Sequence, residues 1–203
     1  MFYRPGIDPH GLPHNPFKAI VAPRPIGWIS TLDAQGRANL APYSFFNAVA
    51  DDPPMVVFSN TGGKDDRDRG KDSVSAIRET GEFVHHVVGQ EWRDSMNASS
   101  GSFPAGTDEF EISGLEKAPS CLVAPPRIKD APAAFECRLW KILDLPGPEN
   151  VMVIGEVVGI HIDEAYLTDG LFDLNKVQPL ARLGYRDYTA VTDLFSLKRP
   201  GQN

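Results

Sequence analysis

The chain has 203 residues and a formal net charge of −7, with 41% hydrophobic and 23% charged residues. This length and composition fit a single folded domain and exclude an intrinsically disordered chain. The negative charge argues against nucleic acid as the main partner, and no apolar run reaches the roughly 18 residues of a membrane span. The first residues lack a signal-peptide pattern, so we expect a cytoplasmic protein.

Residues 1–16 hold four prolines and show no hydrophobic periodicity, which predicts an N-terminal arm. We expect residues 17–203 to form one domain with a C-terminal extension. The pattern over residues 19–32 favours a strand, and residues 33–36 have the composition of a hairpin turn. Residues 37–46 then read as the returning strand. Because Pro42 lacks a backbone N–H, it predicts a sheet edge or a bulge in this strand.

The next segment alternates short apolar strands with one capped helix. Residues 55–59 form a buried strand pattern, and residues 61–70 are rich in glycine and charge. A helix is expected to start at Asp72 or Ser73, which can cap it, and to stop at Gly81. Residues 82–88 predict a strand, residues 90–100 a helix, and residues 101–118 a loop.

The second half of the chain predicts two long strands. Residues 134–143 alternate apolar and charged side chains, as in a half-buried antiparallel strand. Residues 151–162 are apolar on both faces and predict a central strand that bends at Gly155 and Gly159. Many strands and few helices indicate a mainly β fold, a barrel with peripheral helices.

Two further segments end in small polar side chains that suit a ligand rim. One contains Ser44, Phe45 and Asn47, and the other contains Ser59 and Asn60 at the end of a strand. Phe45 and the residue after it would point to opposite faces of an extended segment, so one of the two can face a ligand. The alternative, that both rings pack in the core and the polar groups only shape turns, stays open.

The charged segment before the predicted helix can bind an anion. Arg69, Lys71, Asp72 and Ser73 lie where the free N–H groups and the positive dipole end of a helix would attract a phosphate. Because residues 64–73 hold as many acids as bases, a solvated, charge-rich loop is the alternative.

Histidine and cysteine spacing predicts no metal site and no catalytic triad. His85 and His86 are adjacent on a strand and therefore face opposite sides. His161 lies between isoleucines and is expected to be structural. Cys121 and Cys137 are expected to be buried free thiols.

Four segments together resemble the flavin reductase-like family over residues 17–188. They are Pro23–Thr31, Asn39–Asn47, Asp52–Asn60 and Lys71–Ser73. The resemblance implies an FMN-binding split β-barrel in which the groups of Ser44–Asn47 contact the flavin. It also implies that Lys71-Asp72-Ser73, a Lys-Asp-Thr motif in the family, holds the FMN phosphate. In that family asparagine often replaces His86, so the role of this histidine stays open.

The resemblance implies an oxidoreductase that passes hydride from NAD(P)H to FMN without a catalytic side chain. No glycine-rich Rossmann motif is present, so NAD(P)H would bind on the barrel near the flavin. Two alternatives remain: an FMN-binding electron carrier or docking flavoprotein with little NAD(P)H turnover, and an enzyme similar to pyridoxamine phosphate oxidases. A homodimer is expected, because relatives place flavin at a subunit interface and Trp140 lies on a polar strand face.

Overall fold

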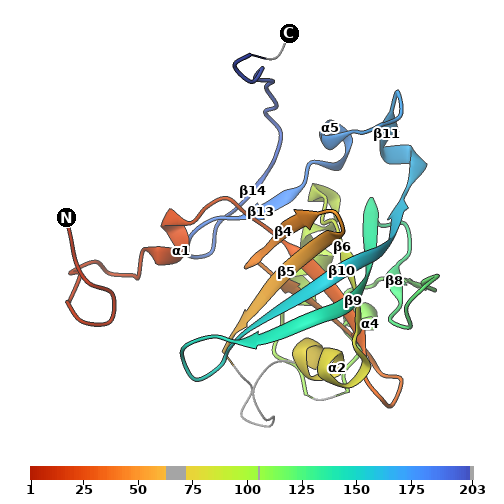
Figure 1. The fold of residues 1–203 in the computed structure, drawn as a ribbon, viewed down its shortest axis with the longest axis horizontal. Helices are drawn as coiled ribbons and strands as arrows, with labels where there is room; N and C mark the ends of the chain where they lie inside the picture. Colours follow the sequence, from red (N-terminus) through yellow and green to blue (C-terminus); the bar gives the residue numbers. More distant parts are fainter. Residues whose placement is uncertain (63–71, 105, 202–203) are drawn as a thin grey trace.

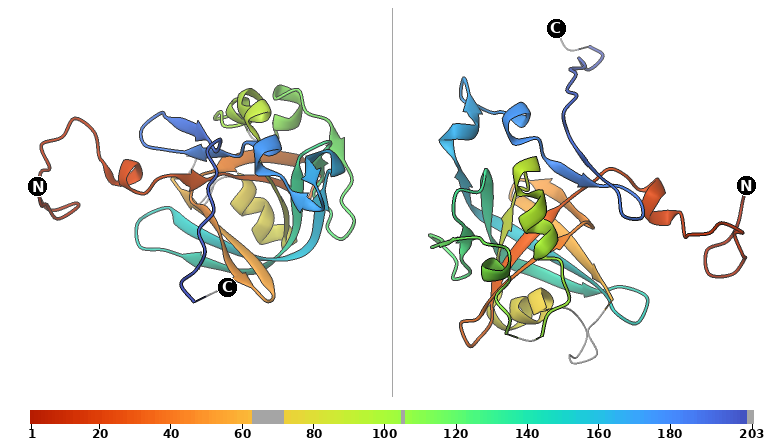
Figure 2. Two further views of the ribbon diagram at one scale, coloured as in Figure 1. Left: turned by 90° about the horizontal axis from the view of Figure 1, so that it is seen from above. Right: turned by 180° about the vertical axis from the view of Figure 1, so that it is seen from behind.

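A seven-stranded antiparallel sheet dominates the computed structural model, which describes residues 1–62, 72–104 and 106–201 (Figure 1). The sheet curls around its core, as Figure 2 shows, and the predicted mainly β fold is confirmed. In order across the sheet, the strands are β3 (Ala38–Tyr43), β2 (Gly27–Leu32), β6 (Glu82–His86), β9 (Ala133–Asp144), β10 (Asn150–Ile162), β5 (Pro54–Thr61) and β4 (Phe46–Asp51).

The chain crosses from one edge of this sheet to the other at Ser44 and Phe45. β3 lies at one edge, where Pro42 needs no second hydrogen-bonding neighbour, and the edge prediction is confirmed. The predicted strand over residues 37–46 is too long, because pairing with β2 ends at Tyr43 and Phe46 starts β4 at the opposite edge. The strand predicted over residues 19–32 likewise begins only at Arg24 and is preceded by α1 (Phe17–Ile20).

β10 is the longest strand and pairs with both β9 and β5. Its register against β9 shifts beside Gly155, where β9 carries the extra residue Trp140, and beside Gly159, where β10 carries the extra residue Val158. The second bulge agrees with the bend predicted at Gly159, whereas the first belongs to β9 and does not show a bend of β10 at Gly155. A Cβ atom on Gly155 would lie 2.5 Å from the ring of Phe83. A side chain at this position would therefore displace a buried ring of the core.

α2 (Asp72–Thr80) covers one end of the curled sheet (Figure 2). Its inner face carries Val74 and Ile77, which are fully buried in the main apolar cluster with Ile29, Phe58 and Phe83. The helix starts at Asp72 and stops before Gly81, whose φ of 73° ends it as predicted.

Shorter elements surround the sheet. The helix predicted over residues 90–100 is split, and the loop predicted over residues 101–118 contains a helical turn and a short strand. The helices are η1 (Gln90–Trp92), α3 (Arg93–Ala98), α4 (Glu109–Ile112), η2 (Glu164–Tyr166) and α5 (Leu174–Val177). The strands are β1 (Arg24–Pro25), β13 (Leu180–Arg182) and β14 (Tyr188–Ala190) in one sheet, with β7 (Lys117–Ala118) paired to β8 (Arg127–Ile128) and β11 (Leu167–Thr168) to β12 (Leu171–Phe172).

Both ends of the chain run away from the sheet, and the N-terminal segment curls into a loop before α1 (Figure 1). Residues 1–16 contain no helix or strand, and residues 191–199 contain none either. Among the described residues, no helix combines the length and the apolar character needed to cross a bilayer.

His86 is a fully buried structural histidine. Its Nδ1 lies 3.0 Å from the carbonyl oxygen of Trp28, and its Nε2 accepts a hydrogen bond of 2.9 Å from the backbone N–H of Ile128. The neutral imidazole with its proton on Nδ1 satisfies both partners. Burial lowers the pKa of His86 to about 4, although the carbonyl of Trp28 acts in the opposite direction.

We expect this histidine to make folding stability depend on pH. The unfolded chain takes up the His86 proton near pH 6.5, whereas the folded chain does so only near pH 4. The contribution of His86 to the free energy of unfolding is therefore fully present above pH 6.5 and is lost as the pH falls towards 4. From about pH 7 to about pH 5 the loss from this site is about 2 kcal/mol, at about 1.4 kcal/mol per pH unit.

Urea unfolding at several pH values measures this dependence. His86→Gln disturbs the two buried hydrogen bonds of the imidazole, so the variant should be less stable than the wild-type chain near pH 7. Because glutamine does not titrate, the free energy of unfolding of the variant should also depend less steeply on pH. The exposed His14 provides the matched control, and His14→Gln should keep the wild-type slope. An unchanged slope in His86→Gln would contradict the assignment.

Candidate functional site

An open groove of about 250 Å³ brings together four of the predicted site residues. Its walls come from the segment before β2, from the crossing between β3 and β4, and from β5 and β10. The lining residues are Val21, Pro23, Arg24, Pro25, Ser44, Phe45, Phe46, Asn47, Val57, Ser59 and Met152. The groove is therefore mainly apolar, with three uncharged polar side chains and one cation.

One backbone hydrogen bond joins the two polar segments that the sequence singles out. The N–H of Ser59 on β5 donates to the carbonyl oxygen of Phe45 at 2.8 Å, next to the paired residues Phe46 and Phe58. Along β5 the side chains alternate, so that Val57 and Ser59 face the groove while Phe58 faces the core. Ser44 and Ser59, which are far apart in the sequence, thus lie in one wall.

The two adjacent phenylalanines have different surroundings, as the extended backbone predicts. The ring of Phe45 lies 5.8 Å from Lys18 Nζ and 5.8 Å from Arg24 Cζ. Phe46 instead stacks on His85, with ring centroids 4.3 Å apart and planes at 11°, and packs against the main apolar cluster. Phe46 therefore anchors the groove to the core, and Phe45 faces cationic side chains.

Arg24 shapes the groove, although the sequence analysis did not name it as a site residue. Its guanidinium donates to the carbonyl oxygens of Lys18 and Val21, and at 2.8 Å to that of Leu183. Burial, together with the charge of Arg182, lowers the pKa of Arg24. No local sequence signal marks this role, because it depends on contacts with carbonyl oxygens that include one 159 residues away, that of Leu183.

Asn60 lies on the opposite face of β5 from Ser59 and does not line the groove. It is 1% exposed, and its Nδ2 donates to the carbonyl oxygen of Gly62 at 2.9 Å. Its Oδ1 is buried and has no hydrogen-bond partner among the described residues. Such an atom is costly unless another group satisfies it, so Asn60 offers an acceptor from inside the barrel.

The start of α2 contacts β3, the strand that ends directly before Ser44. Ser73 is fully buried, and its hydroxyl accepts a hydrogen bond of 2.9 Å from Nδ2 of Asn39. Tyr43, the residue directly before Ser44, also contacts the Ser73 hydroxyl, and burial raises the pKa of this tyrosine to about 12. Arg69 and Lys71 lie outside the described residues.

A hollow of about 130 Å³ beside the start of α2 is acidic in its described lining. It contains Asp72 and Glu109 together with Asn39 and Tyr43. Two carboxylates disfavour a phosphate unless cations compensate for them. A phosphate site at this helix start therefore depends on Arg69 and Lys71.

The structure also joins three residues whose spacing in the sequence gave no signal. Cys121 is exposed, which makes the buried-thiol prediction wrong for this residue, whereas Cys137 is buried as predicted. One potential ligand atom each from Cys121, Glu136 and His161 lie within 4.8 Å of one another. Intervals of 15 and 25 residues separate them in the sequence. The pairing of β9 with β10 brings Glu136 and His161 together, and the hydrogen bond from the Cys121 N–H to Glu136 adds the cysteine.

The family model that describes the flavin reductase like domain matches residues 21–181. An uncharacterized protein from Aquifex aeolicus is 38% identical over 180 residues, which cover 88% of this chain and 90% of the relative.

Two solved structures share the fold over nearly the whole chain. Nitrilotriacetate monooxygenase component B from Bacillus cereus is 27% identical with a TM-score of 0.88, covering 97% of this chain and 98% of its own. The 2-nitrobenzoate 2-nitroreductase NbaA of Pseudomonas fluorescens is 33% identical with a TM-score of 0.80, covering 91% and 89%. The structural neighbours are split-barrel proteins, as the sequence predicts. The match over residues 21–181 shows that this chain belongs to the flavin reductase-like family.

Proposed function

We propose that the chain binds FMN in the groove between Arg24 and Ser59 and passes hydride from NAD(P)H to the flavin. The observation that carries this proposal is the groove itself, where an apolar floor meets Ser44, Asn47 and Ser59. A flavin ring needs a flat apolar slot with a few polar groups at its edge. The family and the oxidoreductase names of two similar structures support the same chemistry.

The described residues fit this cofactor. Phe45, Val57 and Met152 offer apolar contact area, and the side chains of Ser44 and Asn47 offer hydrogen bonds at one edge. When bound, FMN supplies the hydride-accepting ring. The protein then has to orient the two ring systems. Among the described residues, the lining of the groove contains no carboxylate.

The phosphate of FMN would be held by Lys71 with Arg69 and the first N–H groups of α2. Ser73 contributes by fixing this helix start to β3 through Asn39, since its hydroxyl is already engaged. The carboxylates of Asp72 and Glu109 make the two cations more important.

NADH or NADPH oxidation with added FMN tests the whole proposal: steady turnover supports a reductase, and FMN binding without turnover supports the electron carrier instead.

Replacement of Lys71 tests the phosphate contact. Lys71→Ala should weaken FMN by roughly tenfold to a hundredfold, because a charge-assisted contact contributes about 1.5–3 kcal/mol. Riboflavin lacks the phosphate and should bind the variant almost as it binds the wild-type chain. Fluorescence titration of both flavins measures the difference. Lys141→Ala, on β9, is the matched control and should change neither affinity, whereas equal weakening of both flavins would refute the contact.

Replacement of Asn47 tests the polar edge of the groove. Asn47→Leu puts an apolar group where the flavin edge needs a hydrogen bond, at a cost of about 1–3 kcal/mol. We expect weaker FMN binding and a shifted flavin reduction potential, with an unchanged circular dichroism spectrum. Asn175→Leu, an exposed change on α5, is the control. If Asn47→Leu alters neither affinity nor potential, Asn47 only shapes its strand.

We propose that the chain acts as a homodimer. Trp140 is 61% exposed on β9, and Phe17, Ile20, Phe195 and Leu197 on the two terminal segments are at least 57% exposed. Apolar side chains on segments that leave the barrel need a partner surface to be buried (Figure 1). A second copy of the chain offers that surface, since every copy carries both segments.

Sedimentation equilibrium tests the dimer. The wild-type chain should have twice the mass of one chain, and a dimer that carries Phe17→Ser together with Ile20→Ser should dissociate at a higher protein concentration than the wild-type dimer. Trp140→Lys should also raise the dissociation constant if β9 takes part in the contact. A stable monomer that keeps full FMN occupancy would contradict the proposal.

A further inference from the structure

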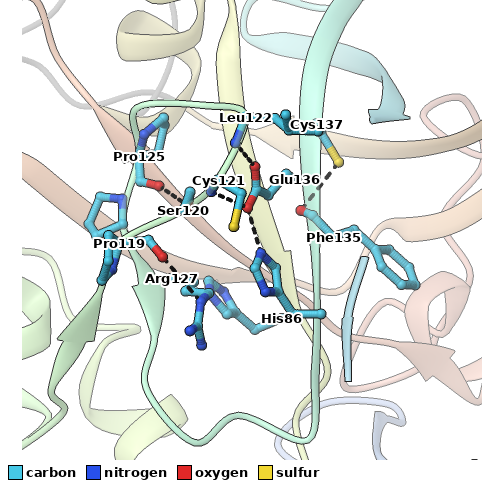
Figure 3. Close-up of polar contacts among 12 residues, drawn as sticks. His86, Pro119, Ser120, Cys121, Leu122, Pro125, Arg127, Phe135, Glu136 and Cys137 are labelled. Atoms are coloured by element: carbon cyan, nitrogen blue, oxygen red, sulfur yellow. Dashed lines mark hydrogen bonds and ion pairs between the residues drawn. The ribbon is translucent and has the colours of Figure 1, made fainter. Parts of the chain in front are cut away.

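Glu136 is a fully buried carboxylate that holds a surface loop against the sheet. Its Oε1 accepts from the backbone N–H of Cys121 at 2.6 Å, and its Oε2 accepts from that of Leu122 at 2.5 Å. Figure 3 shows the carboxylate between β9 and this loop, with the sulfur of Cys121 beside it. Nε2 of His161 on β10 lies 2.5 Å from Oε1.

The carboxylate stays ionised in this position. Burial raises the pKa of Glu136, but the hydrogen bonds from His161 and from the N–H groups of Cys121 and Leu122 outweigh it and hold the pKa below its usual value. A buried anion therefore lies next to an imidazole nitrogen and a thiol. These three donors suit a borderline-soft divalent ion such as Zn²⁺.

An ion bound to Oε1 of Glu136 could replace the contact that this oxygen makes with His161. Each carboxylate oxygen has two acceptor positions, and on Oε1 the Cys121 N–H uses one while His161 uses the other. Zn–ligand distances of about 2.0–2.3 Å place tetrahedral ligands roughly 3.5 Å apart. The three atoms already lie within 4.8 Å, and Cys121 is on an exposed loop.

We propose that Cys121, Glu136 and His161 form a Zn²⁺ site that is separate from the groove. Sγ of Cys121, Oε1 of Glu136 and a ring nitrogen of His161 are the three protein ligands. Cys121 is exposed and the side chain of His161 is 25% exposed, so the fourth position faces solvent. Binding displaces the thiol proton of Cys121 to solvent. His161 binds through Nε2 with its proton on Nδ1, so that the ion takes the place of the N–H contact on Oε1. The site clamps residues 121–122 to β9 and β10.

The test uses the full-length chain, stripped of metal and kept reduced. Titration with Zn²⁺ should show one equivalent per chain, and Co²⁺ should give a thiolate-to-cobalt absorption band in the difference spectrum. Mg²⁺, which prefers oxygen ligands, should not compete. Bound Zn²⁺ should also protect Cys121 from alkylation.

Cys121→Ser removes one of three ligands on an exposed loop and should not disturb folding. We expect the cobalt band to vanish and Zn²⁺ affinity to fall at least roughly tenfold, since outer-shell changes alone cost about 10–100-fold. His14→Gln, which removes an exposed histidine elsewhere, should bind like the wild-type chain. The proposal is overturned if no stoichiometric binding occurs, or if Cys121→Ser binds as tightly as the wild-type chain. In either case FMN binding is unaffected, so failure here is distinguishable from failure of the proposed function.

Discussion

The hydrogen bond from the Ser59 N–H to the Phe45 carbonyl oxygen is the constraint on which the candidate site depends. The chain must cross from one edge of the sheet to the other between Tyr43 and Phe46, and the crossing is only two residues long. This bond extends the pairing of β4 with β5 by one step into the crossing. It thereby fixes Ser44 and Phe45 beside the end of β5, where Ser59 completes the same wall.

The opposite wall is held by a buried cation. Arg24 connects the carbonyl oxygens of Lys18 and Val21 with that of Leu183 from the C-terminal part of the chain. A guanidinium can satisfy several carbonyl oxygens at once because it has five donors in a rigid plane. The groove is therefore framed on one side by backbone pairing and on the other by a single side chain, and its floor is the apolar face of Val57 and Met152.

Two buried titratable groups on neighbouring strands hold the connection between β7 and β9. His86 on β6 accepts from Ile128, and Glu136 on β9 accepts from Cys121 and Leu122. Both groups satisfy backbone N–H donors of a segment with little regular structure, which would otherwise leave those donors without partners. This arrangement explains why an imidazole and a carboxylate are buried beside an apolar core, and it places Cys121 and His161 near the same anion.

The sequence by itself determined the mainly β architecture, the helix that starts at Asp72 and ends before Gly81, the edge position of Pro42 and the irregularity of β10 beside Gly159. Each follows from local rules of periodicity, capping and backbone geometry, which act within a few residues. Tertiary structure decided that Ser59 faces the groove while Asn60 faces the interior, that Arg24 forms a wall, and that Cys121 meets Glu136 and His161. These arrangements depend on strand register and on contacts between residues far apart in the chain, which local patterns do not encode.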